Sequence, residues 1–148
     1  MYVLVCGPPG AGKTTIATRA QDRLTASGHP FRMLHSDDFA SRTYPRMYER
    51  LEGSEADWLV DGTFQDREWQ EQFRGLGEAY FVVVTASLET CLERNRARDT
   101  RERIEEEGVR VVHGEFRPPR DPALVLDTDD LTVEAAVDTL GNSVRAWL

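Results

Sequence analysis

The stretch Gly7-Pro8-Pro9-Gly10-Ala11-Gly12-Lys13-Thr14 decides the fold, because it matches in full the phosphate-binding loop pattern GxxxxGK[ST]. Lys13 is the only lysine among the 18 Lys and Arg residues of this 148-residue chain. A lysine ammonium is a compact charge on a flexible stem, whereas arginine presents a planar fork, so the two are not interchangeable at a phosphate. The chain therefore keeps its one lysine where phosphate chemistry requires it.

The loop lies between a predicted strand and a predicted helix. The run Tyr2–Cys6 is almost wholly apolar, as is typical of a buried parallel strand, and the apolar residues after the loop recur at helical spacing until Gly28. Backbone N–H groups of such a loop cradle an anion, so this context favours a real phosphate site over a chance match in a turn. The residues expected to bind the nucleotide phosphates are Gly7, Pro9, Gly10, Ala11, Gly12, Lys13, Thr14 and Thr15.

Length and composition fit one domain, residues 1–148, with an ordinary core, since 40% of the residues are hydrophobic. No stretch is long enough to span a membrane, and the N-terminus is expected to be a strand rather than a signal peptide. Cys6 and Cys91 show neither a CxxC nor a zinc spacing, which fits a reducing cytoplasm. The net charge of −8 disfavours a surface that coats nucleic acid but leaves a local basic site open.

Strands and helices alternate along the chain. After Tyr2–Cys6, strands are expected at Phe31–His35, Trp58–Val60, Tyr80–Thr85 and Ala123–Leu126. Helices are expected at Arg67–Leu76, from about Ser87, and after a cap at Thr132, where one face would carry Val133, Val137, Leu140, Val144 and Trp147. This order predicts an α/β fold, with a five-stranded parallel sheet and helices on both faces.

Acidic residues follow three of these strands, at the edge of the sheet where ligands bind. Asp37 and Asp38 could accept the proton of an attacking hydroxyl or orient a Mg2+ water, but they could also cap a helix. Asp61 could be a metal-site carboxylate or begin an Asp61-Gly62 turn. Asp127 and Asp129 follow the last strand. Thr14 is the expected hydroxyl ligand of Mg2+.

Eight arginines occur between positions 94 and 120: Arg94, Arg96, Arg98, Arg101, Arg103, Arg110, Arg117 and Arg120. Glutamates accompany them, so one interpretation is a solvated helix with i,i+4 ion pairs. The other is a mobile lid, at about residues 95–118, that closes over a triphosphate and neutralises the charge that develops during transfer. Arg94 and Arg98 are the main candidates for this role.

The order of these motifs resembles small phosphate-loop (P-loop) kinases, namely AAA_33-like polynucleotide 5′-hydroxyl kinases and adenylylsulfate kinases. The resemblance rests on the loop, Ser36-Asp37-Asp38-Phe39, Val60-Asp61-Gly62-Thr63-Phe64 and Arg94-Asn95-Arg96-Ala97-Arg98. It implies a single-domain P-loop NTPase/kinase fold with ATP and Mg2+ as cofactors. In polynucleotide kinases the first Asp of the pair is the general base, which corresponds to Asp37. The second Arg of the RNxxR run acts on the transferring phosphate, which corresponds to Arg98, and Arg94 would lie near the nucleotide base.

The acceptor is less well defined. The stretch Glu115–Pro122 followed by Leu124–Thr128 is similar to adenylylsulfate kinases, but the GFS–DR segment of that family is absent. Polynucleotide kinases usually carry an Arg where this chain has Ala40. A regulatory GTPase is disfavoured, because its NKxD motif needs a second lysine. The residues that could hold an acceptor phosphate or sulfate are Arg42, Arg46 and Arg67.

The sequence therefore predicts an ATP-dependent kinase that transfers the γ-phosphoryl group to a hydroxyl of a small, nucleotide-like acceptor. Lys13, Asp37 and Arg98 would be catalytic, and Thr14 and Asp61 would hold Mg2+. A polynucleotide or tRNA-directed hydroxyl kinase is the first alternative, and a nucleotide-binding regulatory module without transfer is the second. A cytoplasmic monomer or homodimer is expected, without a membrane partner.

Overall fold

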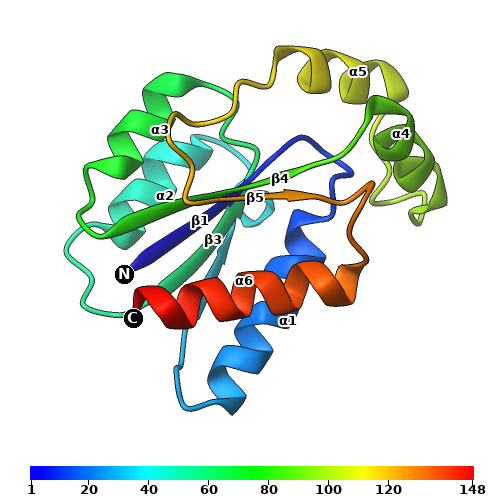
Figure 1. Cartoon of the computed structure of the whole chain (residues 1–148). Coiled ribbons are helices and arrows are strands. Elements are labelled where there is room, and N and C mark those ends of the chain that lie inside the picture. Colours follow the sequence, from blue (N-terminus) through cyan, green and yellow to red (C-terminus); the bar gives the residue numbers. More distant parts are fainter.

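The computed structural model describes residues 1–148 as an α/β fold built on one parallel sheet of five strands (Figure 1). The strands are β1 (Tyr2–Cys6), β2 (Arg32–His35), β3 (Trp58–Gly62), β4 (Ala79–Thr85) and β5 (Leu124–Asp127). Their order in the sheet is β2-β3-β1-β4-β5, so the chain passes from one side of β1 to the other between β3 and β4. The carboxyl end of β1 is therefore the topological switch point, where parallel sheets bind their ligands.

Helices cover both faces of the sheet. They are α1 (Lys13–Ala26), α2 (Thr43–Leu51), α3 (Arg67–Arg74), α4 (Leu88–Ala97), α5 (Glu106–Glu115) and α6 (Val133–Trp147), with a short 3-10 turn at Ser36–Asp38. In Figure 1, α1 and α6 lie on one face and α2 and α3 on the other, while α4 and α5 lie at the end of the molecule opposite the two termini. No helix of the protein is both long and apolar enough to span a membrane.

Two apolar cores, one on each face, hold these layers together. Val3 and Val5 of β1 belong to the core with α1 and α6, whereas Leu4 and Cys6 belong to the core with α2 and α3. Alternate side chains of a strand point to opposite faces, so a strand covered on both sides must be apolar throughout. All five residues of β1 are buried, which explains the unbroken apolar run seen in the sequence.

The predicted elements are confirmed, with small shifts at their ends and two corrections. Ser87 and Thr132 do cap α4 and α6, through side-chain bonds to the N–H groups of Thr90 and Ala135. Val133 begins the predicted apolar face of α6 but does not join the core, since its side chain is 41% exposed in the first turn. Asp61 lies inside β3 rather than in a turn after it.

Candidate active site

The phosphate-binding loop connects β1 to α1 and is seated on β4 and α4. Gly10 has φ +85°, and a Cβ atom there would lie 2.7 Å from the carbonyl oxygen of Cys91 in α4. A Cβ on Gly7 would lie 2.0 Å from the carbonyl oxygen of Val84 in β4. Only glycine fits both positions, because the left-handed conformation and the close backbone approach exclude a side chain. Their glycines thus let the loop pack closely against β4 and α4, and within the loop the N–H of Ala11 donates to the carbonyl oxygen of Pro8.

Lys13 begins α1 and faces a polar cavity of about 390 Å³ at the carboxyl edge of the sheet. The cavity is lined by Pro9, Lys13, Thr14, Ser36, Asp37, Asp61, Thr63, Arg98, Glu102 and Ile104. Burial lowers the pKa of Lys13, the carboxylates of Asp61 and Asp37 oppose this shift, and Arg98 adds to it. The structure thus places candidate residues from four separate segments of the chain around one cavity: Lys13 and Thr14, Asp37, Asp61, and Arg98.

Asp61 is 2% exposed and accepts a hydrogen bond from the ring of His35, with Nδ1 and Oδ2 2.5 Å apart. The two residues are register partners on the neighbouring parallel strands β2 and β3. One oxygen of Asp61 is therefore engaged by His35, which fixes the orientation of the carboxylate beside Lys13. Sequence reasoning missed His35, because its partnership with Asp61 depends on the order of the strands. Its place directly before Ser36-Asp37-Asp38 was the available signal.

Asp37 and Asp38 point into different cavities. Asp37 shares the polar cavity with Lys13, whereas Asp38 lines a neighbouring cavity of about 520 Å³ with Phe39, Arg46, Glu49 and Arg50. The alternative role as a helix cap is not seen: the N-cap position of α2 is Arg42, and no side chain caps that helix. Geometry therefore favours Asp37 as the carboxylate that can reach a reacting hydroxyl at the phosphate site.

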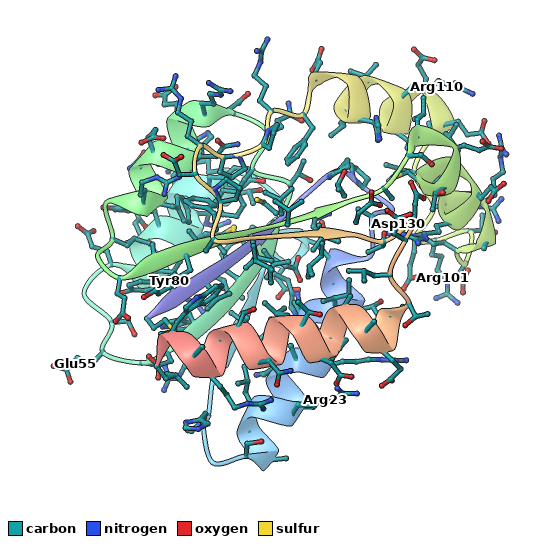
Figure 2. The ribbon with its side chains drawn as sticks, in the orientation of Figure 1. Arg23, Glu55, Tyr80, Arg101, Arg110 and Asp130 are labelled. Carbon is teal, nitrogen blue, oxygen red and sulfur yellow. The ribbon has the colours of Figure 1, made fainter.

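The one ion pair of the arginine-rich segment joins two helices rather than residues four apart in one helix, and the mobile lid stays a prediction. Arg96 forms an ion pair with Glu106 that joins α4 to α5, and Arg103 donates to the carbonyl oxygens of Arg96 and Arg98. Arg98, at the end of α4, instead lines both the polar cavity and the small hollow of the loop that contains Gly10, Gly12 and Thr15. Figure 2 shows Arg101 and Arg110 at the end of the molecule that carries α4 and α5, whereas Tyr80 and Glu55 lie toward the opposite end.

Arg94 contacts the phosphate-binding loop through backbone carbonyl groups. Its guanidinium donates hydrogen bonds to the carbonyl oxygens of Gly10 and Ala11 and to Thr128 in the β5–α6 connection. The expected contact between Arg94 and a nucleotide base stays a prediction, since these bonds hold the guanidinium on protein backbone.

Asp129, which follows the last strand, bonds to the start of α4 and not to the polar cavity. Its carboxylate accepts hydrogen bonds from Thr90 Oγ1 at 2.5 Å and from Ser87 N at 2.7 Å, and these bonds lower its pKa.

Tyr44 and Gln70 hold the turn that follows β3. Tyr44 accepts a hydrogen bond from the N–H of Phe64, whose φ is +48°, and its ring packs on that of Phe64. The buried amide of Gln70 donates to the carbonyl oxygens of Phe64 at 2.7 Å and Arg117 at 2.6 Å. These bonds join the turn after β3 to the segment after α5. Sequence reasoning had not identified Gln70.

The oxygen atoms at the site fit a magnesium ion shared with a nucleotide. Mg2+ usually keeps several waters and binds through one or two carboxylates plus substrate phosphates. The hydroxyl of Thr14 and the carboxylates of Asp37 and Asp61 line one cavity and supply such donors. No group of three or more His, Cys, Asp or Glu side chains is close enough to form a cage made of protein alone.

A phosphate-binding loop at the switch point of a parallel sheet, with lysine, carboxylates and arginine around one cavity, defines the class: the protein is a P-loop kinase, a phosphotransferase. More specifically, the chain belongs to the AAA domain family (AAA_33), whose model matches residues 3–119. The resemblance to small P-loop kinases and the predicted fold are thereby confirmed.

Individual relatives include kinases with different acceptors. The chain is 27% identical over 147 residues to a probable adenylyl-sulfate kinase of Archaeoglobus fulgidus, with 86% of this chain and 95% of that one covered. The adenylylsulfate kinase of Mycobacterium tuberculosis, solved with AMPPNP and APS, superposes with a TM-score of 0.76 at 17% identity over 97% and 96% of the two chains. A gluconokinase from Sinorhizobium meliloti superposes with a TM-score of 0.72 at 16% identity over 99% and 96%. At these identities the two structures show a shared fold.

Proposed function

We propose that the protein transfers the γ-phosphoryl group of ATP to a hydroxyl of a small, nucleotide-like acceptor, in the manner of an adenylylsulfate kinase. The observation that carries the proposal is the shared cavity of about 390 Å³, which Lys13, Thr14, Asp37, Asp61 and Arg98 line together. These side chains come from the phosphate-binding loop, the end of β2, the end of β3 and the end of α4. Such convergence supplies the positioning and electrostatic stabilisation on which phosphoryl transfer depends.

On the donor side, the N–H groups of the loop and of the first turn of α1 bind the β-phosphate. Lys13 donates to β- and γ-phosphate oxygens, since its ammonium is the one flexible point charge available. Mg2+, held by Thr14 and Asp61, would neutralise charge on the phosphate oxygens when it is bound. His35 keeps the carboxylate of Asp61 in one orientation, through the 2.5 Å hydrogen bond described above.

On the acceptor side, Asp37 takes the proton of the attacking hydroxyl. The acceptor oxygen forms a bond to the γ-phosphorus while the bond to the β–γ bridging oxygen breaks, and ADP leaves with that electron pair. Arg98 donates to the transferring group, where negative charge accumulates in the transition state. Asp37 lies in the cavity of Lys13, which supports this assignment over Asp38.

Residues of about 95–118 act as a lid in this scheme. The segment contains the end of α4, the turn that carries Arg98 and Glu102, and α5. Its closure would exclude water from the phosphate site, which favours transfer to the acceptor over hydrolysis. Ile104 is 40% exposed and also lines the cavity, so it supplies an apolar surface for this closure.

The nucleotide-like character of the acceptor is supported by the relatives and by a second cavity. The relative from Archaeoglobus fulgidus, a probable adenylyl-sulfate kinase, covers most of both chains. A polar cavity of about 620 Å³ between the turn after β3 and the end of α5 contains Arg67 and Arg117. Two guanidinium groups suit a phosphate or sulfate of the acceptor. Asp66 and Glu115 also line this cavity, and Arg46 and Arg50 line the cavity of Asp38, so Arg67 and Arg46 both stay candidates for this contact.

The alternatives differ from this proposal in measurable ways. Accumulation of ADP should depend on an added acceptor, and a panel of adenylylsulfate, nucleosides, polyols and a 5′-hydroxyl oligonucleotide would identify the class. Turnover with the oligonucleotide, together with binding that weakens steeply with salt, would indicate a polynucleotide kinase instead. ATP binding without acceptor-dependent ADP would contradict phosphoryl transfer to every class in the panel and favour a regulatory module.

A cytoplasmic location is part of the proposal. It is supported by Cys6 and Cys91, which are both free and buried, because unpaired thiols are typical of reducing compartments. A monomer or a homodimer is proposed for the assembly.

A further inference from the structure

The guanidinium of Arg94 and the hydroxyl of Thr128 form one hydrogen-bonded network, the loop clamp. Arg94 Nη1 lies 3.1 Å from the carbonyl oxygens of both Gly10 and Ala11 and 2.8 Å from Thr128 Oγ1, and Nη2 lies 3.1 Å from the carbonyl oxygen of Thr128. Thr128 is 8% exposed, and its Oγ1 lies 2.9 Å from the carbonyl oxygen of Ala11. The clamp therefore joins α4, the phosphate-binding loop and the β5–α6 connection.

The loop needs such partners because of how it binds anions. When successive N–H groups converge on a phosphate, the carbonyl groups of the same peptides point outward. Ala11 is fully buried, so its carbonyl oxygen cannot rely on water and requires a protein donor. Gly10 and Gly12 have φ of +85° and +98°, and glycine has the greatest backbone freedom of any residue. Without the clamp, peptide units of the loop could rotate and turn a carbonyl oxygen toward the bound phosphate.

We propose that Arg94 is a positioning residue that holds the loop in its anion-binding shape, so that its contribution to nucleotide binding does not depend on the base. The inference rests on the proposed use of a nucleoside triphosphate as donor. It differs from the role implied by the resemblance to polynucleotide kinases, in which Arg94 would lie at the nucleotide base. The bonds to Gly10, Ala11 and Thr128 engage the guanidinium on oxygen atoms of the protein, and Arg94 does not line the small hollow of the loop.

Binding of ATP, GTP and inorganic tripolyphosphate to Arg94→Met separates the two roles, because tripolyphosphate has no base. The clamp predicts that all three dissociation constants rise by the same factor, roughly tenfold, which is the size expected for lost charge-assisted hydrogen bonds. Thr128→Val should give the same base-independent pattern, and the double variant should be less than additive, since both changes break one network. Arg145→Met is the control, because Arg145 is exposed on α6 and bonds only to Asn142 of its own helix.

Thermal unfolding of each variant keeps stability separate from binding, and Arg94→Lys serves if Arg94→Met does not fold. The lysine variant retains the positive charge but loses the planar guanidinium, so it should also raise the dissociation constants of all three ligands by the same factor. A variant that binds tripolyphosphate like the wild type but binds ATP more weakly would overturn the clamp in favour of a base contact. Wild-type protein that binds neither ATP nor tripolyphosphate would contradict the proposed function itself.

Discussion

At the scale of single residues, neighbours in the sequence have different surroundings in the fold. Asp37 and Asp38 are adjacent, yet the 3-10 turn at Ser36–Asp38 directs one toward Lys13 and the other toward Arg46 and Arg50. A general base must lie within hydrogen-bond reach of the proton it accepts. Of these two aspartates only Asp37 lines the cavity of the phosphate-binding lysine, so Asp37 and Asp38 should contribute unequally to catalysis.

Asp37→Asn should lower kcat by roughly 10²- to 10⁴-fold, because an amide cannot accept the proton of the attacking hydroxyl. The KM for ATP should change little, since the loop and Lys13 still bind the phosphates. Asp38→Asn is the matched control and should retain most of the activity. Steady-state kinetics with the identified acceptor would check this. The reverse result, with Asp38→Asn inactive and Asp37→Asn active, would reassign the base.

At the scale of elements, the sequence predicted strands and helices better than the contacts between them. The apolar runs of β1 and β4 and the caps Ser87 and Thr132 are local signals, so their elements were expected close to where the structure has them. The candidate residues of the cavity were also predictable, because ligands of parallel sheets bind at the carboxyl ends of the strands. The His35–Asp61 bond and the contacts of Arg94 were not, since they depend on strand order and on how α4 packs against the loop.

The turn between α4 and α5 is held by a buried amide. Asn95 is 1% exposed, and its side chain donates to the carbonyl oxygen of Ile104 at 2.7 Å and accepts from the N–H of Ile104 at 3.0 Å. These two bonds close the turn that carries Arg98, Glu102 and Ile104 into the polar cavity. Asn95 is thus a buried side chain that holds the proposed lid in place without lining the cavity, alongside the exposed bonds of Arg103 and Arg96.

Asn95→Leu should lower kcat by roughly tenfold, because two backbone groups of Ile104 lose their partners at a cost of about 1–3 kcal/mol. Hydrogen exchange at the amide of Ile104 should become faster in this variant. Arg101→Ala is the control, since Arg101 is exposed in the same turn and should leave both quantities unchanged. Unchanged kcat in Asn95→Leu, with fast exchange at Ile104, would show that the order of this turn does not matter for transfer.

At the scale of the whole molecule, the two cores enclose groups that titrate at alkaline pH. Burial raises the pKa of Cys6 to about 12, and it also raises the pKa of Cys91 and Tyr44. In the unfolded chain a thiol loses its proton near pH 8.5. Above that pH the unfolded state therefore binds fewer protons than the folded state, so the free energy of unfolding must fall as the pH rises.

Cys6 alone should contribute a decrease of about 1.4 kcal/mol per pH unit once the pH exceeds its unfolded pKa. Urea unfolding of the wild type and of Cys6→Ala at pH 7.5 and at pH 9.5 would measure this. Each protein is compared with its own value at pH 7.5, so the packing cost of the substitution cancels. The wild type should lose more stability over this interval than Cys6→Ala. An equal loss in both proteins would mean that the Cys6 thiol ionises in the fold as readily as in water.

Transfer of label from γ-labelled ATP to an acceptor hydroxyl, in the presence of Mg2+, tests the central claim most directly. The wild type should label one acceptor of the panel, with adenylylsulfate the first to examine. Lys13→Ala should fold but transfer no label, because no other lysine exists in the chain to replace its ammonium. Full transfer by Lys13→Ala would contradict the role of the phosphate-binding loop. ATP binding by the wild type without transfer to any acceptor would contradict the kinase activity proposed for this chain.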